Sequence, residues 1–152
     1  MTTGAREQVP ARVAVRAATS RDVDRIAAIE AAAFSQPWSR ESFAELLVTP
    51  SARMLVAVHD PDTIIGYAVL YLAADESELA NLAVSASYRG RGVGRRLLEA
   101  AMGEAAARGA RHMYLEVRAS NYAAQSLYGS AGFTAVGRRH RPATTASPSP
   151  AR

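Results

Sequence analysis

The chain has 152 residues, 49% of them hydrophobic and 21% charged, which is the balance of one ordinary globular domain. It has no cysteine, which excludes disulfides, a catalytic thiolate and cysteine-based zinc sites. No apolar run approaches the roughly 20 residues of a membrane-spanning helix, and the N-terminal MTTGAREQVP lacks the apolar stretch of a signal peptide. We therefore expect a cytoplasmic protein without a membrane partner.

The net charge of +4 is unevenly distributed. All 18 basic residues are arginine, and two groups of four stand out: Arg89, Arg91, Arg95 and Arg96 in one short segment, and Arg138, Arg139, Arg141 and Arg152 near the C-terminus. A compact arginine cluster beside glycines favours one small polyanion over direct nucleic-acid binding, which usually spreads a basic face interleaved with aromatics. A compositional bias toward arginine explains the missing lysine but not the clustering.

Periodicity in the first half of the chain predicts a strand over 13–17 and a helix from Thr19 or Ser20 to about Ala33. The loop 34–38 precedes a second helix, which Ser39 caps. Strands are expected over 53–59 and 63–72, joined by a turn at 60–62, and over 76–84.

In the second half, a long helix follows a glycine-rich loop and should end at Gly109. Its apolar stripe consists of Val93, Leu97, Leu98, Ala101 and Ala105. We expect a strand over 111–117, a short helix over 121–131 and a last strand from Phe133 to about Arg139. Residues 1–11 are expected to be a flexible lead-in, residues 12–140 the domain, and the Pro/Ser/Thr-rich residues 141–152 a disordered tail.

The loop Arg89-Gly90-Arg91-Gly92-Val93-Gly94 carries the strongest chemical signal. Alternating glycines let a backbone approach a ligand and present successive N–H groups to it. The N-terminus of the following helix adds its unpaired N–H groups and the positive end of its dipole. The pattern predicts a site for a pyrophosphate; the alternative is a glycine-rich turn with solvated arginines.

Two other phosphate loops are excluded by residue identity. A Walker loop needs Gly-Lys-Ser/Thr, and the chain has no lysine. The dinucleotide fingerprint G-x-G-x-x-G would require glycine at Arg95 or at Leu97, depending on which glycine starts it.

The loop resembles the acetyl-CoA loop Q/R-x-x-G-x-G/A of the GNAT superfamily of N-acetyltransferases, with Arg89, Gly92 and Gly94 in the defining places. Three further segments resemble the ribosomal-protein-alanine N-acetyltransferases of that superfamily, in the same order along roughly 13–140. They are Phe34 to Ser39 with its Pro-Trp-Ser, Asn81-Leu82-Ala83-Val84, and Leu115-Glu116-Val117-Arg118-Ala119-Ser120-Asn121 running into Leu127-Tyr128 and Gly132-Phe133.

The resemblance implies an α/β (α+β) fold with a mixed, mostly antiparallel central sheet of about six strands and about four flanking helices. It implies direct transfer of the acetyl group of acetyl-CoA to the N-terminal α-amine of a protein, typically alanine of a small-subunit ribosomal protein. No metal is implied, and a monomer or weak dimer is expected. His59 and His112 stand alone within strand patterns and are expected to be structural.

The same resemblance implies the catalytic pair. Glu116 would be the general base and Tyr128 the acid that protonates the departing thiolate. Spacing alone leaves Glu116 open to a plain ion pair with Arg118, and leaves Tyr128 open to a core role beside Leu127. Asn121 can cap its helix, contact coenzyme A, or do both.

The expected acetyl-CoA-binding residues come from the end of one strand, the loop and the helix start: Leu82, Ala83, Val84, Arg89, Gly90, Arg91, Gly92, Val93, Gly94, Arg95 and Asn121. Phe34 and Trp38 are expected either to wall the acceptor groove or to belong to the core. Glu76 and Glu78 are further candidates for a base or for anchoring the acceptor amine.

One departure from the family affects acceptor recognition. The family follows its last strand with Arg-Arg-x-Tyr-Tyr-Pro and another apolar strand, whereas this chain has Arg138-Arg139-His140-Arg141-Pro142 and no apolar strand after it. The final family strand is thus expected to be missing. Two alternatives stay open: a GNAT enzyme acting on a small-molecule amine, and a non-catalytic module that binds acetyl-CoA or the ribosome.

Overall fold

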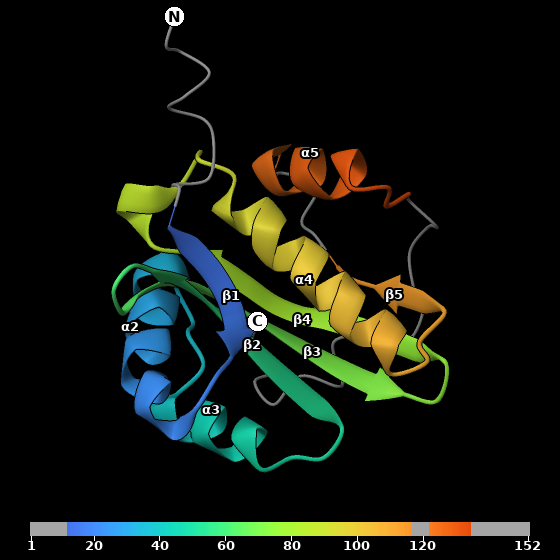
Figure 1. The fold of residues 1–152 in the computed structure, drawn as a ribbon, viewed down its shortest axis with the longest axis horizontal. Helices are drawn as coiled ribbons and strands as arrows, with labels where there is room; N and C mark the ends of the chain where they lie inside the picture. The colour runs from blue at the N-terminus through green and yellow to red at the C-terminus, as the bar shows by residue number, and fades with distance from the viewer. Residues whose placement is uncertain (1–11, 117–121, 135–152) are drawn as a thin grey trace, which may run out of the picture.

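The computed structural model describes residues 12–116 and 122–134. Over these residues the chain forms five strands, four α-helices and two 3-10 turns (Figure 1). In chain order they are β1 (Val13–Ala17), η1 (Ser20–Asp22), α2 (Val23–Ala33), α3 (Arg40–Leu47), β2 (Ala52–His59), β3 (Thr63–Ala73), β4 (Glu76–Val84), η2 (Ala86–Tyr88), α4 (Val93–Ala107), β5 (His112–Tyr114) and α5 (Tyr122–Ser130).

The strands form one mixed sheet in the order β1-β2-β3-β4-β5. The first three pairings are antiparallel, and β5 joins β4 in parallel. This parallel pairing is short, running from Glu76 opposite His112 to Glu78 opposite Tyr114. Over the described residues, the second half of β4 therefore extends beyond its ladder with β5.

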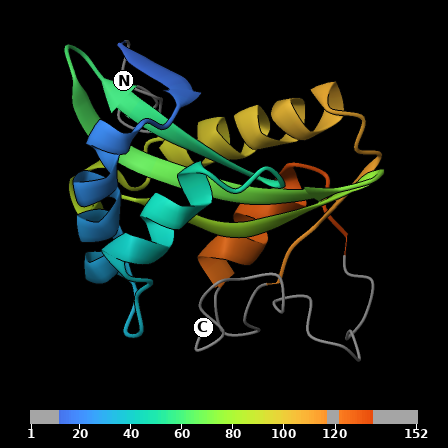
Figure 2. The same ribbon diagram turned by 90° about the horizontal axis from the view of Figure 1, so that it is seen from below.

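Helices cover both faces of the sheet (Figure 2). Helix α4 packs on one face through its predicted stripe, and all five residues of that stripe are buried. Helices α2 and α3 pack on the other face around Ile26, Phe43 and Tyr67. Helix α5 lies beside the first turns of α4 (Figure 1), where Arg95 donates a hydrogen bond to Ser130 Oγ at 2.7 Å.

Strand β4 contains a bulge close to the middle of its length. Val69 pairs with Asn81 while Leu70 pairs with Leu79, so Ala80 is an extra residue on β4. A bulge places two neighbouring side chains on the same side of a sheet. Ala80 packs against the α2/α3 core, and Asn81 bonds to Glu30 of α2, so both face that side.

The expected fold class is confirmed, and most expected elements are found within a residue or two. The expected strand 111–117 is an exception, because only His112–Tyr114 pair with β4. Leu115 and Glu116 continue the alternation in sequence but have no strand pairing, and residue 117 lies outside the described part. The expected last strand 133–139 lies mostly outside it as well, and Phe133 is not in a strand.

Candidate functional site

The glycine loop leads directly into α4. Gly92 is the N-cap residue with φ 87° and ψ 4°, and Gly90 has φ 77°, so both are in the left-handed region that glycine adopts without strain. The carbonyl of Gly92 accepts the first helical bond, from Arg96 N at 3.1 Å. The first N–H groups of any α-helix lack intrahelical acceptors, and the dipole there favours an anion. The local geometry thus fits a phosphate ligand.

Arg89 of the loop and Arg95 in the first turn of α4 make hydrogen bonds to neighbouring elements. Arg89 Nε donates to the carbonyl of Val84 at 2.9 Å, which ties the loop to the end of β4. Arg95 Nε donates to Glu99 at 3.0 Å, and its other nitrogens donate to the side chain and carbonyl of Ser130. Arg89 therefore anchors the loop to β4, Arg95 joins α4 to α5, and both contribute positive charge near the loop.

Arg91 is exposed at the tip of the same loop. Its guanidinium lies 5.5 Å from the centre of the Tyr88 ring, which is a cation–π distance. The Tyr88 hydroxyl is hydrogen-bonded to His59 Nδ1 at 3.1 Å. The His59–Tyr88 pair links β2 to the loop, consistent with the structural role expected for this histidine.

The end of β4 and the helices α4 and α5 meet around Gly94. A Cβ on Gly94 would lie 3.6 to 3.8 Å from side-chain atoms of Leu127, Val84 and Leu82, so these three side chains surround the start of α4. Leu82 and Val84 face the α4 core, and Ala83 faces the α2/α3 core. Leu82 and Val84 of β4, Gly94 at the start of α4 and Leu127 of α5 are thus brought together at one end of the sheet.

Tyr128 lies on α5 and is partly buried against the α4 core. Its ring makes an edge contact with Phe133, with the ring centres 5.9 Å apart. Burial raises the pKa of the Tyr128 phenol above its ordinary value. The hydroxyl is therefore protonated at neutral pH, as a proton donor must be.

Glu116 follows β5 and is exposed. Met113 and Leu115 pack toward the α4 core. Asn121, expected to cap α5 or to contact coenzyme A, lies outside the described residues, as does Arg118, the alternative ion-pair partner of Glu116.

Of the residues expected to bind the acceptor, some lie in the core and others at the surface. Trp38 is 2% exposed, and its ring centre lies 5.5 Å from that of Phe43, so it belongs to the core, which is the alternative that the sequence left open. Phe34 is partly buried against the same core. Glu76 is exposed.

Glu78 is half-buried and lies between two tyrosines across the sheet, because Tyr71 of β3 and Tyr114 of β5 are its partners in register. Burial, together with the charge of Glu78, raises the pKa of Tyr71 to about 12. Directly paired side chains share a face, and Tyr71 packs on the α2/α3 side, so this row of three polar side chains also lies on that side.

Glu30 is the most deeply buried polar residue among those described, and sequence reasoning missed it. It is fully buried, and its carboxylate accepts hydrogen bonds from Trp38 N, the Tyr67 hydroxyl and Asn81 Nδ2. One signal was available: Glu30 stands four residues after Ile26, on the inward face of α2.

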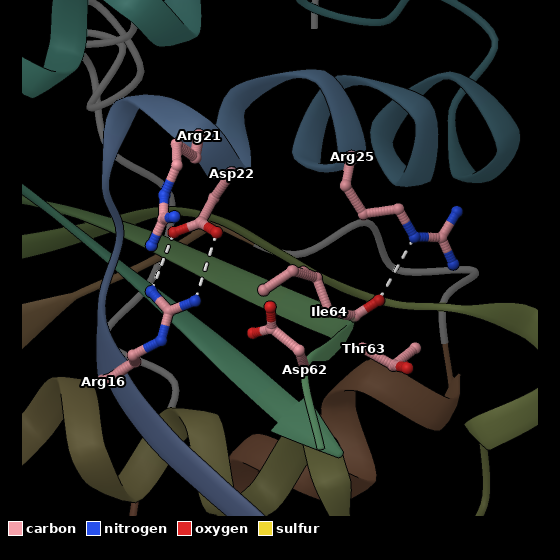
Figure 3. A pocket seen from close by; sticks show the side chains of 7 residues that line it. All are labelled: Arg16, Arg21, Asp22, Arg25, Asp62, Thr63 and Ile64. Carbon is pink, nitrogen blue, oxygen red and sulfur yellow. Dashed lines mark hydrogen bonds and ion pairs between the residues drawn. The ribbon is translucent and has the colours of Figure 1, made fainter. Parts of the chain in front are cut away.

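A recess of about 350 Å³ opens beside the start of α2 (Figure 3). Three arginines and two aspartates line it together with Thr63 and Ile64. Arg16 forms an ion pair with Asp22, and Arg25 Nε donates to the carbonyl of Ile64 at 3.2 Å. Three arginines against two aspartates leave the lining with only a small formal positive charge.

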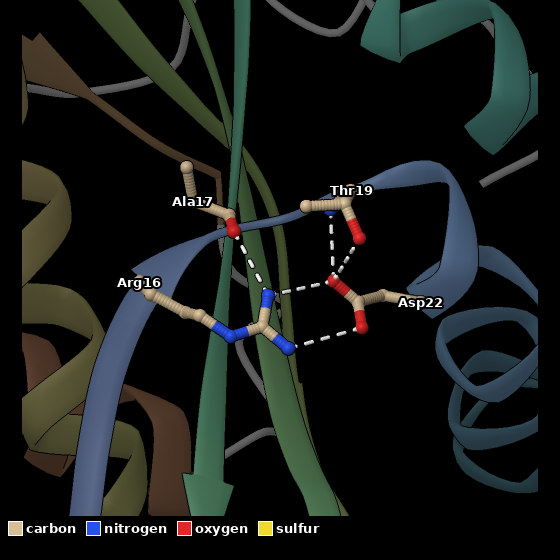
Figure 4. A network of polar contacts seen from close by, with 4 residues as sticks. All are labelled: Arg16, Ala17, Thr19 and Asp22. Carbon is tan, nitrogen blue, oxygen red and sulfur yellow. Dashed lines mark hydrogen bonds and ion pairs between the residues drawn. The ribbon is translucent and has the colours of Figure 1, made fainter. Parts of the chain in front are cut away.

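The Arg16–Asp22 pair belongs to the turn that starts the first helix (Figure 4). Asp22 accepts two hydrogen bonds from Arg16, at 2.8 and 3.1 Å, and one from the backbone N–H of Thr19 at 2.8 Å. Arg16 also donates to the carbonyl of Ala17. The network fixes the angle at which β1 leads into α2.

Over the part of the chain that the structure describes, no group of three or more His, Asp or Glu side chains could hold a metal ion. Within the same residues, none of the helices is both long and apolar enough to cross a membrane.

Comparison with known proteins identifies the class. The profile of the Acetyltransferase (GNAT) family matches residues 23–133. A crystal structure of the ribosomal-protein-S18-alanine N-acetyltransferase from Escherichia coli has a TM-score of 0.76 and 32% identity, covering 88% of this chain and 86% of that one. The chain therefore belongs to the GNAT family of acetyltransferases, and it is an acetyltransferase of that family.

Two curated relatives refine the comparison. The [ribosomal protein bS18]-alanine N-acetyltransferase of Haemophilus ducreyi is 38% identical over 117 residues, covering 76% of this chain and 79% of the relative. The N-alpha-acetyltransferase RimI of Mycobacterium tuberculosis is 38% identical over 135 residues, covering 85% of this chain and 83% of the relative. The resemblance inferred from the sequence motifs is confirmed.

Proposed function

We propose that this protein transfers the acetyl group of acetyl-CoA to the N-terminal α-amine of a protein, with alanine of ribosomal protein S18 as the expected acceptor. The observation that carries the proposal is the glycine loop, which leads into α4 with two left-handed glycines and meets the end of β4 and α5. The names of the relatives support the choice of acceptor.

Acetyl-CoA, when bound, supplies an activated thioester carbonyl and a thiolate leaving group. The main-chain N–H groups from Gly92 to Arg95 would hold its pyrophosphate, with Arg91 adding exposed positive charge. The main chain of Leu82, Ala83 and Val84, just beyond the β4 bulge, would hold the thioester in place. Asn121 is proposed to line the pantetheine arm.

Tyr128 would donate its proton to the leaving sulfur. Burial raises its pKa, so the phenol is fully protonated over the physiological range. Glu116 would accept the proton of the incoming amine. A peptide α-amine, with a pKa of about 8, is far easier to deprotonate than a lysine side chain at about 10.4, so one exposed carboxylate is adequate for this acceptor.

The two faces of the sheet give the proposal its geometry. Helix α5 with Tyr128 packs on the α4 side, whereas Glu78 and its tyrosine neighbours lie on the α2/α3 side. Among the described residues, β5 pairs only with Glu76 to Glu78, so the second half of β4 has no partner in β5 there. The acceptor peptide would approach from the α2/α3 side, past Phe34, Glu76 and Glu78, while acetyl-CoA enters beside α4 and α5.

The test is acetyl transfer to defined peptides. The protein is incubated with acetyl-CoA and three peptides: one beginning with the N-terminal sequence of ribosomal protein S18, the same peptide with a blocked N-terminus, and a blocked peptide containing lysine. Mass spectrometry should find one acetyl group on the first peptide only. Acetylation confined to lysine, or confined to a polyamine in a parallel incubation, would contradict the proposed acceptor. Binding of acetyl-CoA without any turnover would indicate a non-catalytic module.

A further inference from the structure

Glu30 forms the centre of a buried polar network between α2 and the sheet. Its side chain is 0% exposed. One carboxylate oxygen accepts from the backbone N–H of Trp38 at 2.8 Å. The other accepts from Asn81 Nδ2 at 2.7 Å and from the Tyr67 hydroxyl, and Asn81 Nδ2 also lies 3.3 Å from the Tyr67 oxygen.

An apolar residue would fill this position at lower energetic cost. Removing a carboxylate from water is expensive unless its oxygens are fully hydrogen-bonded. Glu30 also lies in the last turn of α2, where the helix dipole disfavours negative charge. Because core packing alone does not call for a charge here, the specific geometry that the charge imposes calls for an explanation.

The network joins two segments that the proposed function places on either side of the reaction. Asn81 directly follows the bulge residue Ala80 and directly precedes the stretch proposed to hold the thioester. Trp38 is in the loop between α2 and α3, and the backbone N–H of Phe34 at the start of that loop donates to the carbonyl of Glu30 at 3.0 Å. Glu30 therefore contacts β4 next to its bulge, through Asn81, and the loop over 34–39 between α2 and α3 (the acceptor-side loop), through Trp38.

We propose that Glu30 is a positioning residue for acetyl transfer, because it fixes the bulged end of β4 relative to the acceptor-side loop through Asn81 and Trp38. The proposal rests on the proposed function for its catalytic consequence. The mechanical link itself is independent of which amine is acetylated.

The three branches of the network can be cut separately. In Glu30→Gln, the single oxygen has to serve the fixed N–H of Trp38, and the NH2 group then faces Asn81 and Tyr67, which have to reorient. Asn81→Ala removes the hydrogen bond from β4 to Glu30, together with the longer contact of Asn81 Nδ2 with the Tyr67 hydroxyl. Tyr67→Phe removes one hydroxyl and keeps the donors of Trp38 and Asn81 to Glu30. Ile26→Val is a control for a small loss of buried volume one helical turn away.

The first readout is backbone hydrogen exchange of the full chain, measured by mass spectrometry. Glu30→Gln should raise exchange about tenfold in both 34–40 and 80–84, and Asn81→Ala in 80–84 alone. Tyr67→Phe and Ile26→Val should leave the ratio of these segments to β2 unchanged. Uniform acceleration in all variants, in proportion to lost stability, would overturn the proposal.

The second readout is the division between kcat and KM, measured well below the melting temperature of each variant. Glu30→Gln and Asn81→Ala should lower kcat about tenfold while the KM for acetyl-CoA changes less than about twofold, since the phosphate loop is untouched. The two controls should keep the wild-type kcat. An unchanged kcat in both network variants would overturn the positioning role. A wild-type chain without transferase activity would instead refute the proposed function, and the exchange pattern would still decide whether Glu30 links the two segments.

Discussion

Gly66 of β3 lies directly beneath Leu97 of α4. A Cβ on Gly66 would approach Leu97 Cδ1 to 2.9 Å and the carbonyl oxygen of Ala83 to 3.0 Å, both closer than packed atoms tolerate. The absence of a side chain at this position lets α4 sit close against β3 and β4. This close packing fixes the distance between α4, which begins at the glycine loop, and the end of β4, which precedes the loop.

Gly66→Ala should therefore destabilise the fold. Leu97 is fully buried and the second contact is with backbone, so neither neighbour can move freely, and a loss of about 1–3 kcal/mol in the free energy of unfolding is expected. Gly103→Ala is the matched control. Gly103 lies on the exposed side of α4, the helix that carries Leu97, and a Cβ added there would have no atom within 4 Å. This substitution should stabilise the protein by roughly 0.5–1 kcal/mol. Urea unfolding of both variants checks the opposite signs.

Local patterns made most of the fold and the glycine loop predictable. The stripe Val93, Leu97, Leu98, Ala101 and Ala105 identified α4, and the strand expected over 76–84 has the observed bounds of β4. The loop was predictable because its glycines lie at alternate positions within one short segment and their function depends on backbone conformation.

The features that were missed depend on contacts between distant residues. Glu30 accepts hydrogen bonds from Tyr67 and Asn81, which are 37 and 51 residues away, so the helical spacing that places it on the inward face of α2 does not reveal its partners. The sequence left open whether Trp38 lines the acceptor groove or belongs to the core, because its packing against Phe43 and α2 is a tertiary contact. The strand over 111–117 was predicted too long because alternation does not reveal where a partner strand stops pairing.

Gly92→Ala should weaken coenzyme A binding. Because the φ angle of Gly92 is 87°, an alanine at this N-cap position would strain the backbone by about 1–2 kcal/mol. Relief of this strain would rotate the backbone and turn the N–H groups of the first helical turn away from the phosphates. We expect the dissociation constant for acetyl-CoA, measured by calorimetry, to rise about tenfold. Gly103→Ala on the same helix should bind normally. Equal affinities for both variants and the wild type would argue that the loop does not hold the phosphates.

Asp22→Asn should lower stability at neutral pH but not in acid. Hydrogen bonds from Arg16, followed by those from Thr19, hold the pKa of Asp22 below its ordinary value against the opposing effect of burial. A lowered folded-state pKa means that the stabilisation is fully present above the unfolded-state pKa and is lost as the pH falls through the folded-state pKa.

The cost at pH 7 should be about 1–2 kcal/mol, at the lower end for a charged hydrogen-bonded group because Arg16 is partly exposed and screened. Thermal unfolding of wild type and variant from pH 7 down to about pH 3 should show the two curves converging, since protonation of Asp22 removes the same interaction. A gap that persists in acid would assign the loss to packing instead.

Tyr128→Phe and Glu116→Gln should separate the two proton transfers. Removing the phenol should lower kcat by on the order of 10², because the leaving sulfur loses its proton donor, while acetyl-CoA binding is retained. Since burial raises the pKa of Tyr128, the wild-type rate should not fall through ionisation of this group anywhere below about pH 10.

Glu116→Gln should instead slow the reaction most at low pH, where the acceptor amine is protonated and needs a base. The rates of variant and wild type should approach each other above the amine pKa of about 8. The measurement is kcat against pH for wild type and both variants with the same peptide. A Tyr128→Phe enzyme with full activity, or a Glu116→Gln enzyme with an unchanged pH profile, would remove the corresponding residue from the mechanism.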